Sequence, residues 1–451
     1  MTKSLPPSHM IDSRVFRDLY GSADMRAVFA DEAMVARWLE VEAALARAQA
    51  RLGLIPQDAA DAISRCAEGA NLDLEALRRG VESTGHPLVP AIRALERLAG
   101  EAGRYVHWGA TTQDIIDTGF VLQLKDALEI IERELERLIA SLAGQARVYK
   151  DTPMAGRTHG QHAVPVTLGY KFAVVMAELC RHRERLAEMR PRVLVGQLAG
   201  AAGTLASLGE QAAPVRQAML DDLRLGVPRI AWHTARDGIA ETVGVLAMIA
   251  ATCGKFANEV VNLQRTEIAE LAEPAGTGAV GSSTMPQKRN PMAAQGVVAL
   301  ARLVRQMPAL ALDAMGHEHE RDLSAWQMEW SFVPETFIMT SGAITQTCRI
   351  AEGLIVDADR MRRNLALTGG LINAEAVMFR LAGKTGREAA HELVAAAVKR
   401  AASGAESFAE VLAADPEIAR HLTRAEIDAA LAPEAWLGES VAAVERIVGG
   451  E

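Results

Sequence analysis

The chain has 451 residues, of which 49% are hydrophobic and 23% are charged, an ordinary balance for a globular protein. This length exceeds one typical hydrophobic core, so we expect two or three domains. The net charge of −9 argues against a nucleic-acid-binding surface. An anionic small molecule would therefore need a local cationic pocket.

The four cysteines lie far apart and form no Cys-x-x-Cys motif. This spacing predicts reduced thiols in a cytoplasmic protein, with neither a disulfide nor a zinc site. The first ten residues carry Lys3 but no apolar core, so we expect no signal peptide. No stretch of about eighteen uncharged apolar residues occurs, and we expect no membrane-spanning segment.

Helical spacing dominates the chain, whose aromatic content is only 4%. We expect Asp31 to cap a first long helix that ends at Gly53. Further along, apolar residues recur three and four apart in one stripe: Val121, Leu124, Leu128, Ile131, Leu135, Leu138 and Leu142. Such a stripe is typical of a helical bundle, and equally of an ordinary core. Similar spacing recurs in residues 166–186, 242–271 and 293–312.

These helices predict an all-α protein with three helical domains. We place a smaller N-terminal domain at residues 1–108, a central bundle of long helices at 109–356, and a C-terminal helical domain at 357–451. Gly369 and Gly370 supply a turn signal early in the last domain.

A glycine-rich segment precedes the most informative motif. Residues 276–281 read Gly-Thr-Gly-Ala-Val-Gly and match the dinucleotide-binding fingerprint, which requires a preceding strand and an acidic residue about twenty positions on. The preceding segment, 256–271, has helical spacing instead, and no acidic residue stands near Leu300. We therefore reject a nucleotide site and interpret the glycines as part of a loop that can close over a substrate.

The motif itself, residues 281–291, reads Gly-Ser-Ser-Thr-Met-Pro-Gln-Lys-Arg-Asn-Pro. It combines hydroxyls, a cation and an amide, the groups needed to remove a proton from carbon and stabilise the resulting anion. Two other segments are rich in polar groups: residues 107–118 (His-Trp-Gly-Ala-Thr-Thr-Gln-Asp-Ile-Ile-Asp-Thr) and residues 156–165 (Gly-Arg-Thr-His-Gly-Gln-His-Ala-Val-Pro).

Together the three segments resemble the signature blocks of the fumarase/aspartase superfamily, in the family's order. Residues 281–291 are similar to its loop GSSxMPxKxNP. The resemblance implies an all-helical homotetramer in which each active site draws residues from three subunits. It implies no cofactor and no metal, and a small dicarboxylate as the substrate.

The resemblance also implies a role for each matched residue. Ser282 is the base, acting as an alkoxide, while Lys288 and Asn290 stabilise the carbanion. Thr158 binds a carboxylate, and His159 serves the leaving group, which suits an imidazole whose ordinary pKa is about 6.5.

Other candidates are expected to bind substrate. Thr111, Thr112 and Gln113 resemble the family's carboxylate-binding cluster. His86 falls where adenylosuccinate lyases carry a His-Asp pair, but Pro87 replaces the aspartate. The remaining substrate-binding candidates are Ser283, Met285, Arg321 and Trp326.

Several positions depart from the nearest branches, the adenylosuccinate lyases and the bacterial 3-carboxy-cis,cis-muconate cycloisomerases. Adenylosuccinate lyases hold the nucleotide phosphate with a serine and an arginine at the positions of Trp326 and Trp330. Indole rings cannot bind phosphate in this way, so a purine nucleotide is disfavoured as the substrate. The tryptophan pair resembles the cycloisomerases instead. His159 favours the lyases of the superfamily over the cycloisomerases, because the bacterial cycloisomerases have tryptophan at this position. Ala235 replaces a substrate-binding glutamine. Gln295 replaces a glutamate that orients and charges the histidine. An amide can still orient His159 through a hydrogen bond but cannot stabilise its cation, so we expect a leaving group that departs with little acid help.

We predict a lyase that eliminates an amine or another heteroatom group from a succinyl or N-substituted aspartate-type substrate, giving fumarate or a substituted fumarate. The first alternative is cycloisomerisation of 3-carboxy-cis,cis-muconate by the same carbanion chemistry. Adenylosuccinate lyase activity and a catalytically inactive structural homologue rank below both.

Overall fold

The computed structural model describes residues 8–274, 284–404 and 406–450. The chain forms two compact units, each assembled from three stretches. The first unit contains Met1–Glu136, Arg181–Gly254 and Val297–Thr345, and the second contains Arg137–Cys180, Lys255–Gly296 and Gln346–Glu451. The division into three domains after residues 108 and 356 remains a prediction.

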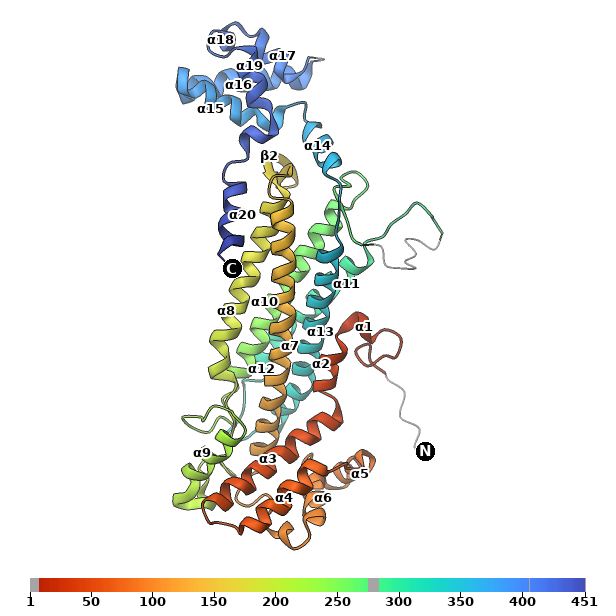
Figure 1. The fold of residues 1–451 in the computed structure, drawn as a ribbon, viewed down its shortest axis with the longest axis vertical. Coiled ribbons are helices and arrows are strands. Elements are labelled where there is room, and N and C mark those ends of the chain that lie inside the picture. The colour runs from red at the N-terminus through yellow and green to blue at the C-terminus, as the bar shows by residue number, and fades with distance from the viewer. Residues whose placement is uncertain (1–7, 275–283, 405, 451) are drawn as a thin grey trace. The chain divides into compact units, whose positions relative to one another are not determined.

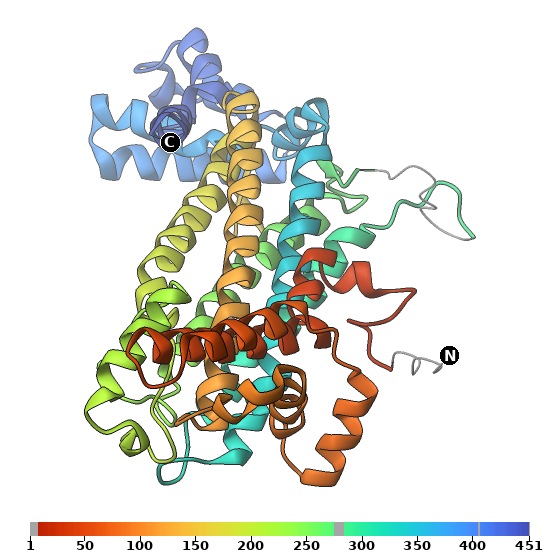
Figure 2. The same ribbon diagram turned by 60° about the horizontal axis from the view of Figure 1, so that its bottom comes forward.

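Long helices dominate both units and contribute a segment to each. They are α7 (Thr112–Val148), α8 (Leu168–Val193), α10 (Asp237–Leu263) and α13 (Leu323–Gly353). Within each unit their segments lie side by side (Figure 1, Figure 2). The apolar stripe predicted at 121–142 lies within α7, and all of its residues are buried. The described strands are short antiparallel pairs, so the predicted all-α class is confirmed.

The first unit adds shorter helices to these segments. They are α1 (Arg17–Tyr20), α2 (Ala23–Val28), α3 (Asp31–Arg51), α4 (Gln57–Gly69), α5 (Leu74–Thr84), α6 (Val89–Ala99), α9 (Ala212–Asp222) and α12 (Met307–Asp313), with 3-10 turns at Gly100–Tyr105 and Ala206–Gln211. The predicted first helix is α3, although Ala30 occupies its N-cap and Asp31 is the first helical residue. Gly53, with φ of 73°, follows its end as expected.

The second unit combines a β-hairpin and a second short antiparallel strand pair with the C-terminal helices. Its strands are β1 (Pro153–Thr158), β2 (Gln161–Thr167), β3 (Leu271–Ala272) and β4 (Ile355–Val356). Its helices are α14 (Ala358–Ala366), α15 (Ala374–Thr385), α16 (Arg387–Ser403), α17 (Phe408–Ala414), α18 (Pro416–Ala419), α19 (Arg424–Leu431) and α20 (Ser440–Gly449), with 3-10 turns at Leu371–Asn373 and Pro433–Trp436. Both capping boxes in this unit, at Ser407 and Thr423, match the Ser/Thr-x-x-Glu pattern.

Three predicted helix boundaries were wrong. Val166 belongs to β2, and α8 begins after it. The segment expected to reach residue 271 ends earlier, because α10 stops at Leu263. The segment 293–312 is divided into α11 (Met292–Val304) and α12. Pro308 lies in the first turn of α12, where its missing N–H costs nothing, and it could not continue α11.

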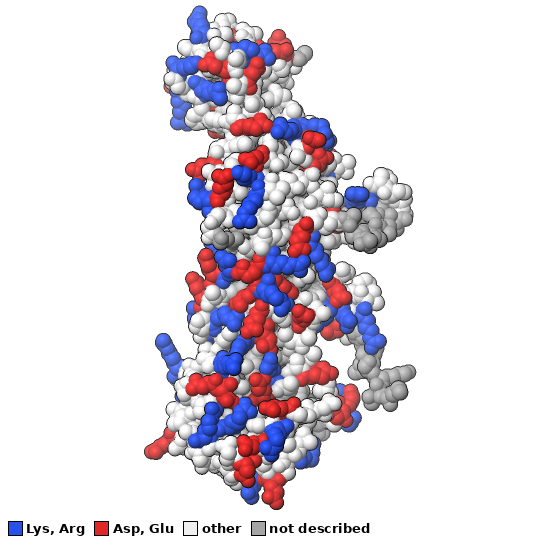
Figure 3. Space-filling model, viewed as in Figure 1, with Lys and Arg blue, Asp and Glu red and all other residues white. Residues whose placement is uncertain are grey.

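Among the described residues, one helix, α10, has the length and hydropathy needed to cross a membrane. In α10, 67% of the apolar window is buried inside the protein, which is typical of a core helix. The bent pair Ala358–Ala366 and Leu371–Thr385, with 81° between its helices, is a weaker candidate. On the face drawn in Figure 3, Lys and Arg are interspersed with Asp and Glu.

Candidate active site

The turn that starts α7 carries the first group of predicted residues. Thr111 precedes the helix, and its backbone N–H donates to Asp114 Oδ2 at 2.9 Å. The same carboxylate, fully buried, accepts the backbone N–H groups of Ala199 and Gly200, each at 2.9 Å. Three backbone donors on one buried acid fix this turn, so the half-buried hydroxyls of Thr111 and Thr112 have a defined position.

His86 lies against this turn. Its Nε2 is 3.2 Å from Thr112 Oγ1, and its Nδ1 accepts the backbone N–H of Leu88 at 3.4 Å. Because Nδ1 is the acceptor, the proton resides on Nε2, which then donates to the threonine hydroxyl. Burial lowers the pKa of His86, and the charges of Arg321 and His107 lower it further. A neutral imidazole therefore faces Thr112.

Arg321 brings a cation to the same turn. Its Nη2 donates to Thr111 Oγ1 at 2.9 Å and to the carbonyl oxygen of Ala201 at 3.0 Å. The guanidinium is exposed and, in the part of the chain described, forms no ion pair with an acid. A guanidinium placed among hydroxyls, with donors left over, is a receptor for a carboxylate. Four predicted residues, His86, Thr111, Thr112 and Arg321, are thus brought together.

A buried ionic network lies behind the turn. Arg236, 2% exposed, donates to Asp117 at 2.9 Å and to Glu329 at 2.9 Å. Gln113 Nε2 donates to Asp117 Oδ2 at 3.2 Å, and Trp326 Nε1 donates to Asp117 Oδ1 at 2.9 Å. Burial opposes the charge of Arg236, but its two acidic partners raise its pKa, so it stays protonated.

This network changes the interpretation of two predicted residues. Gln113 is fully buried and Trp326 is 4% exposed, and each uses a side-chain N–H to hold Asp117. Both therefore support the turn from behind, and a direct substrate contact by either stays a prediction.

The role of Arg236 in this network was not predicted from the sequence. A signal was available, because Asp117 and Asp114 continue the apolar stripe that begins at Val121 backwards at helical spacing. Carboxylates buried on such a face require donors or a cation, which Arg236 supplies.

The second group of predicted residues lies in the second unit, at the tip of the β1–β2 hairpin. Thr158 pairs with Gln161, and the two residues between them have positive φ: 52° for His159 and 76° for Gly160. A two-residue turn with both φ values positive is type I′, the turn whose twist suits a hairpin. Thr158 and His159 are both exposed.

An ion pair next to the turn fixes the first strand of the hairpin. Arg157 donates to the two carboxylate oxygens of Glu270 at 2.9 and 2.6 Å, and Glu270 is fully buried. Asn364 donates to the same acid at 2.7 Å. The backbone of residue 159 is therefore well supported, while its imidazole forms no hydrogen bond or ion pair with any described residue.

The signature loop is described only from residue 284 onward. Ser282 and Ser283 lie outside the described residues. Lys288 and Met285 are exposed, and the backbone N–H of Lys288 donates to the carbonyl oxygen of Met285 at 3.0 Å. Asn290 is half-buried. Among the described residues, neither Lys288 nor Asn290 hydrogen-bonds to His159, so the chain by itself does not bring this second group together.

Gln295, proposed to orient the histidine, is exposed on α11. No hydrogen bond joins it to His159 among the residues described. The orienting role of Gln295 is therefore still a prediction.

The described fold is a bundle of long helices, and comparisons with known proteins identify its family. Residues 20–305 match the family described as Lyase, and residues 370–447 match the family described as Adenylosuccinate lyase C-terminus. The chain therefore belongs to the fumarase/aspartase superfamily of lyases.

Individual relatives cover almost the whole chain. A 3-carboxy-cis,cis-muconate cycloisomerase of Pseudomonas aeruginosa is 46% identical, over 96% of this chain and 95% of the relative. An N-acetyl-S-(2-succino)cysteine lyase of Enterococcus italicus is 41% identical, over 98% of this chain and 97% of the relative. The crystal structure of a fumarate lyase from Mesorhizobium sp. BNC1 superposes with a TM-score of 0.91 at 44% identity, covering 96% of this chain and 99% of that one.

Proposed function

We propose that this protein catalyses β-elimination of a heteroatom group from a succinate derivative, releasing fumarate or a substituted fumarate. The observation that carries the proposal is the cluster at the start of α7. There an exposed guanidinium without an acidic partner among the described residues lies 2.9 Å from the Thr111 hydroxyl, next to Thr112 and neutral His86. This arrangement suits one carboxylate of a dicarboxylic substrate.

The reaction assigned to the remaining residues is balanced without a cofactor. Ser282 takes the proton from the carbon beside one carboxylate, and Lys288 with Asn290 stabilises the electron pair left on that carboxylate. The pair then forms the double bond and expels the heteroatom, which receives a proton from His159 while Thr158 holds a carboxylate. These roles rest on the resemblance of the sequence segments.

The leaving group follows from two considerations. His159 is an ionisable residue at a position where, by resemblance, the bacterial cycloisomerases have tryptophan, so it can pass a proton to the departing atom. Gln295, in place of a glutamate, cannot stabilise the charged imidazole, and this favours an atom that departs with little acid help. One relative is named for a succinyl group carried on sulfur. We therefore propose a thioether or a secondary amine of succinate as the substrate class.

Cycloisomerisation of 3-carboxy-cis,cis-muconate is the second candidate. It is favoured by the relative of that name at 46% identity and by the Trp326–Trp330 pair, whose rings lie 4.9 Å apart. Both reactions pass through a carbanion next to a carboxylate, so the same base and cation serve either.

We also propose that the protein assembles as a homotetramer with shared active sites. His159 and Lys288 are exposed within one chain, and neither side chain has a partner among the described residues. A second and third copy could supply the missing neighbours, as the family resemblance implies.

A substrate panel tests the proposed function. N-acetyl-S-(2-succino)cysteine, several N-substituted aspartates, adenylosuccinate and 3-carboxy-cis,cis-muconate are incubated separately with the protein. We expect fumarate absorbance to appear with the thioether or an amine, and to be abolished in Ser282→Ala. Loss of the muconate diene absorbance, with no fumarate from any other compound, would establish the second candidate instead.

A further inference from the structure

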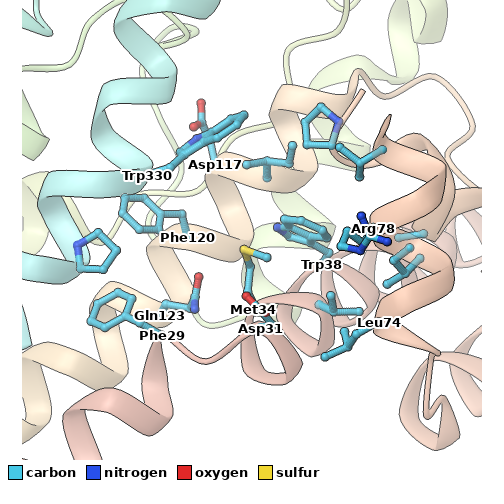
Figure 4. A pocket seen from close by; sticks show the side chains of 17 residues that line it. Phe29, Asp31, Met34, Trp38, Leu74, Arg78, Asp117, Phe120, Gln123 and Trp330 are labelled. Atoms are coloured by element: carbon cyan, nitrogen blue, oxygen red, sulfur yellow. The ribbon is translucent and has the colours of Figure 1, made fainter. Parts of the chain in front are cut away.

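We propose that a cavity in the first unit receives an apolar, uncharged substituent of the leaving group. This inference rests on the proposed elimination reaction and narrows its substrate class. The cavity has a volume of about 420 Å³ and is lined by residues of α3, α5, α6, α7 and α13 (Figure 4). Ligand pockets of small molecules fall in this size range.

The walls of the cavity are mainly apolar. Trp38, Phe120 and Trp330 provide aromatic surface, and Met34 and Leu77 provide aliphatic surface (Figure 4). Aromatic walls bind an uncharged ring or alkyl chain through area removed from water and through offset or edge contacts.

The charged residues that line the cavity do not provide a binding site for an anionic ligand. Asp117 is already held by Arg236 and Trp326. Arg78 forms ion pairs with Glu75 and Glu82 on its own helix. Asp31 is an exposed acid at the lining, and it disfavours an anion. The cavity therefore suits neither a phosphate nor a further carboxylate.

The cavity adjoins the carboxylate cluster along α7. Ile116 lines the cavity one helical turn after Thr112, about 6 Å along the axis, and Phe120 lies one turn further on. Pro87, which directly follows His86, also lines it. A substrate whose carboxylate is bound at Arg321 would reach the cavity with a substituent of a few heavy atoms.

This juxtaposition predicts how the rate depends on the leaving group. Each added methylene should raise kcat/KM about 2- to 4-fold until the cavity is filled, because the group moves from water to an apolar wall. A leaving group that carries a carboxylate or phosphate in place of the alkyl chain should gain nothing.

The experiment uses the full-length protein and a series of S-substituted 2-mercaptosuccinates, from methyl through butyl to benzyl. The kcat/KM for fumarate release is measured for each compound. We expect the benzyl compound to exceed the methyl compound by at least about 30-fold, from the transfer of several carbons. A carboxymethyl compound serves as the charged control.

Two variants distinguish an effect of filling the cavity from a general effect of introducing a tryptophan at a partly exposed position. Val81 lines the cavity and is 36% exposed, so Val81→Trp narrows the cavity at tolerable risk to the fold. Val227 is also 36% exposed and does not line it, so Val227→Trp is the matched control. We expect Val81→Trp to remove most of the benzyl advantage and to leave the methyl compound unchanged, whereas Val227→Trp preserves both.

A binding measurement keeps the two proposals distinguishable. Benzyl alcohol is used as an uncharged probe, and its contact with the protein is followed by ligand-observed NMR in wild type and Val81→Trp. Fumarate release that is independent of substituent size, with no binding of the probe, would overturn the cavity inference and leave the elimination standing. If no compound releases fumarate, the proposed function and the leaving-group assignment fail together, and probe binding lost in Val81→Trp would identify the cavity as a ligand site alone.

Discussion

The start of α7 and the tip of the β1–β2 hairpin hold their candidate side chains in opposite ways. At α7 the hydroxyl of Thr111 and the imidazole of His86 already have partners within the chain. At the hairpin the backbone is fixed by a type I′ turn, but the imidazole of His159 is exposed and unpartnered among the described residues. The chain thus preorganises the groups assigned to binding, and it fixes only the backbone beneath the group assigned to proton transfer.

The largest expected effect concerns the group assigned to proton removal. Ser282→Ala should lower kcat by about 10³-fold or more and leave KM and thermal stability nearly unchanged, because a hydroxyl used only in the transition state is lost. Steady-state kinetics with the best panel substrate and a thermal melt check this. Thr284→Ala, two residues away, is the control and should keep most of the activity. Retention of most of the wild-type kcat in Ser282→Ala would remove this residue from the mechanism.

The next effect concerns the network behind α7. Arg236→Met leaves the buried carboxylates of Asp117 and Glu329 without their cation and should destabilise the fold by about 3–5 kcal/mol. Urea denaturation at a fixed protein concentration measures this loss. Arg420→Met breaks only an exposed pair with Glu417 and should change stability by less than about 1 kcal/mol. Equal effects in the two variants would contradict a structural role for the network.

A smaller effect is expected at the carboxylate receptor. Arg321→Met removes the exposed guanidinium beside Thr111 and should raise KM about 30-fold with a smaller change in kcat, because it removes ground-state binding. Arg229→Met, an exposed arginine in the same unit, is the control. A fall in kcat with unchanged KM would show that Arg321 acts in the chemical step. It would contradict the assignment of the groups at the start of α7 to substrate binding.

The smallest effect is a pH dependence. Burial works against the charge of His107, but Glu42, 2.6 Å away, outweighs it and raises the pKa of the imidazole. A raised pKa stabilises the folded protein fully below the unfolded value of about 6.5, and this stabilisation disappears as pH rises through the folded value. His107→Gln should therefore lower stability by about 1.5 kcal/mol at pH 5.5, with a smaller difference at pH 8.5.

Thermal melts at several pH values measure this difference. His391→Gln, whose imidazole is exposed on α16, should show no such trend. A difference between wild type and His107→Gln that grows with pH would contradict the ion pair as its source.

Periodicity predicted most of the fold because long helices bury one continuous stripe. The apolar residues of the stripe from Val121 to Leu142 recur at helical spacing, and each of these stripe residues is buried in α7. The β1–β2 hairpin was missed, since β1 contains Gly156 and a shift in register next to it, and its turn reads His-Gly in place of the commoner Asn-Gly. Local propensity is weak there, and the buried Arg157–Glu270 pair, distant in sequence, supplies the support.

The candidate site was predicted only in part, because the resemblance indicates which residues matter but not how each side chain is oriented. The family resemblance identified His86, Thr112 and Arg321 as candidates, and the structure brings them to one turn. Segment matching did not indicate that Trp326 faces inward to Asp117, because an indole N–H on a helix is as compatible with a surface contact as with a buried one.

The two-residue turn at His159–Gly160 limits which sequence changes the hairpin can accept. The ladder pairs Thr158 directly with Gln161, so one inserted residue would shift the register and reverse the faces of the adjoining side chains. Exchanging the side chain at 159, by contrast, leaves the path of the backbone intact. A substitution at residue 159 can therefore exchange the reactive group without moving the backbone, whereas a change in loop length would disturb the pairing of the two strands.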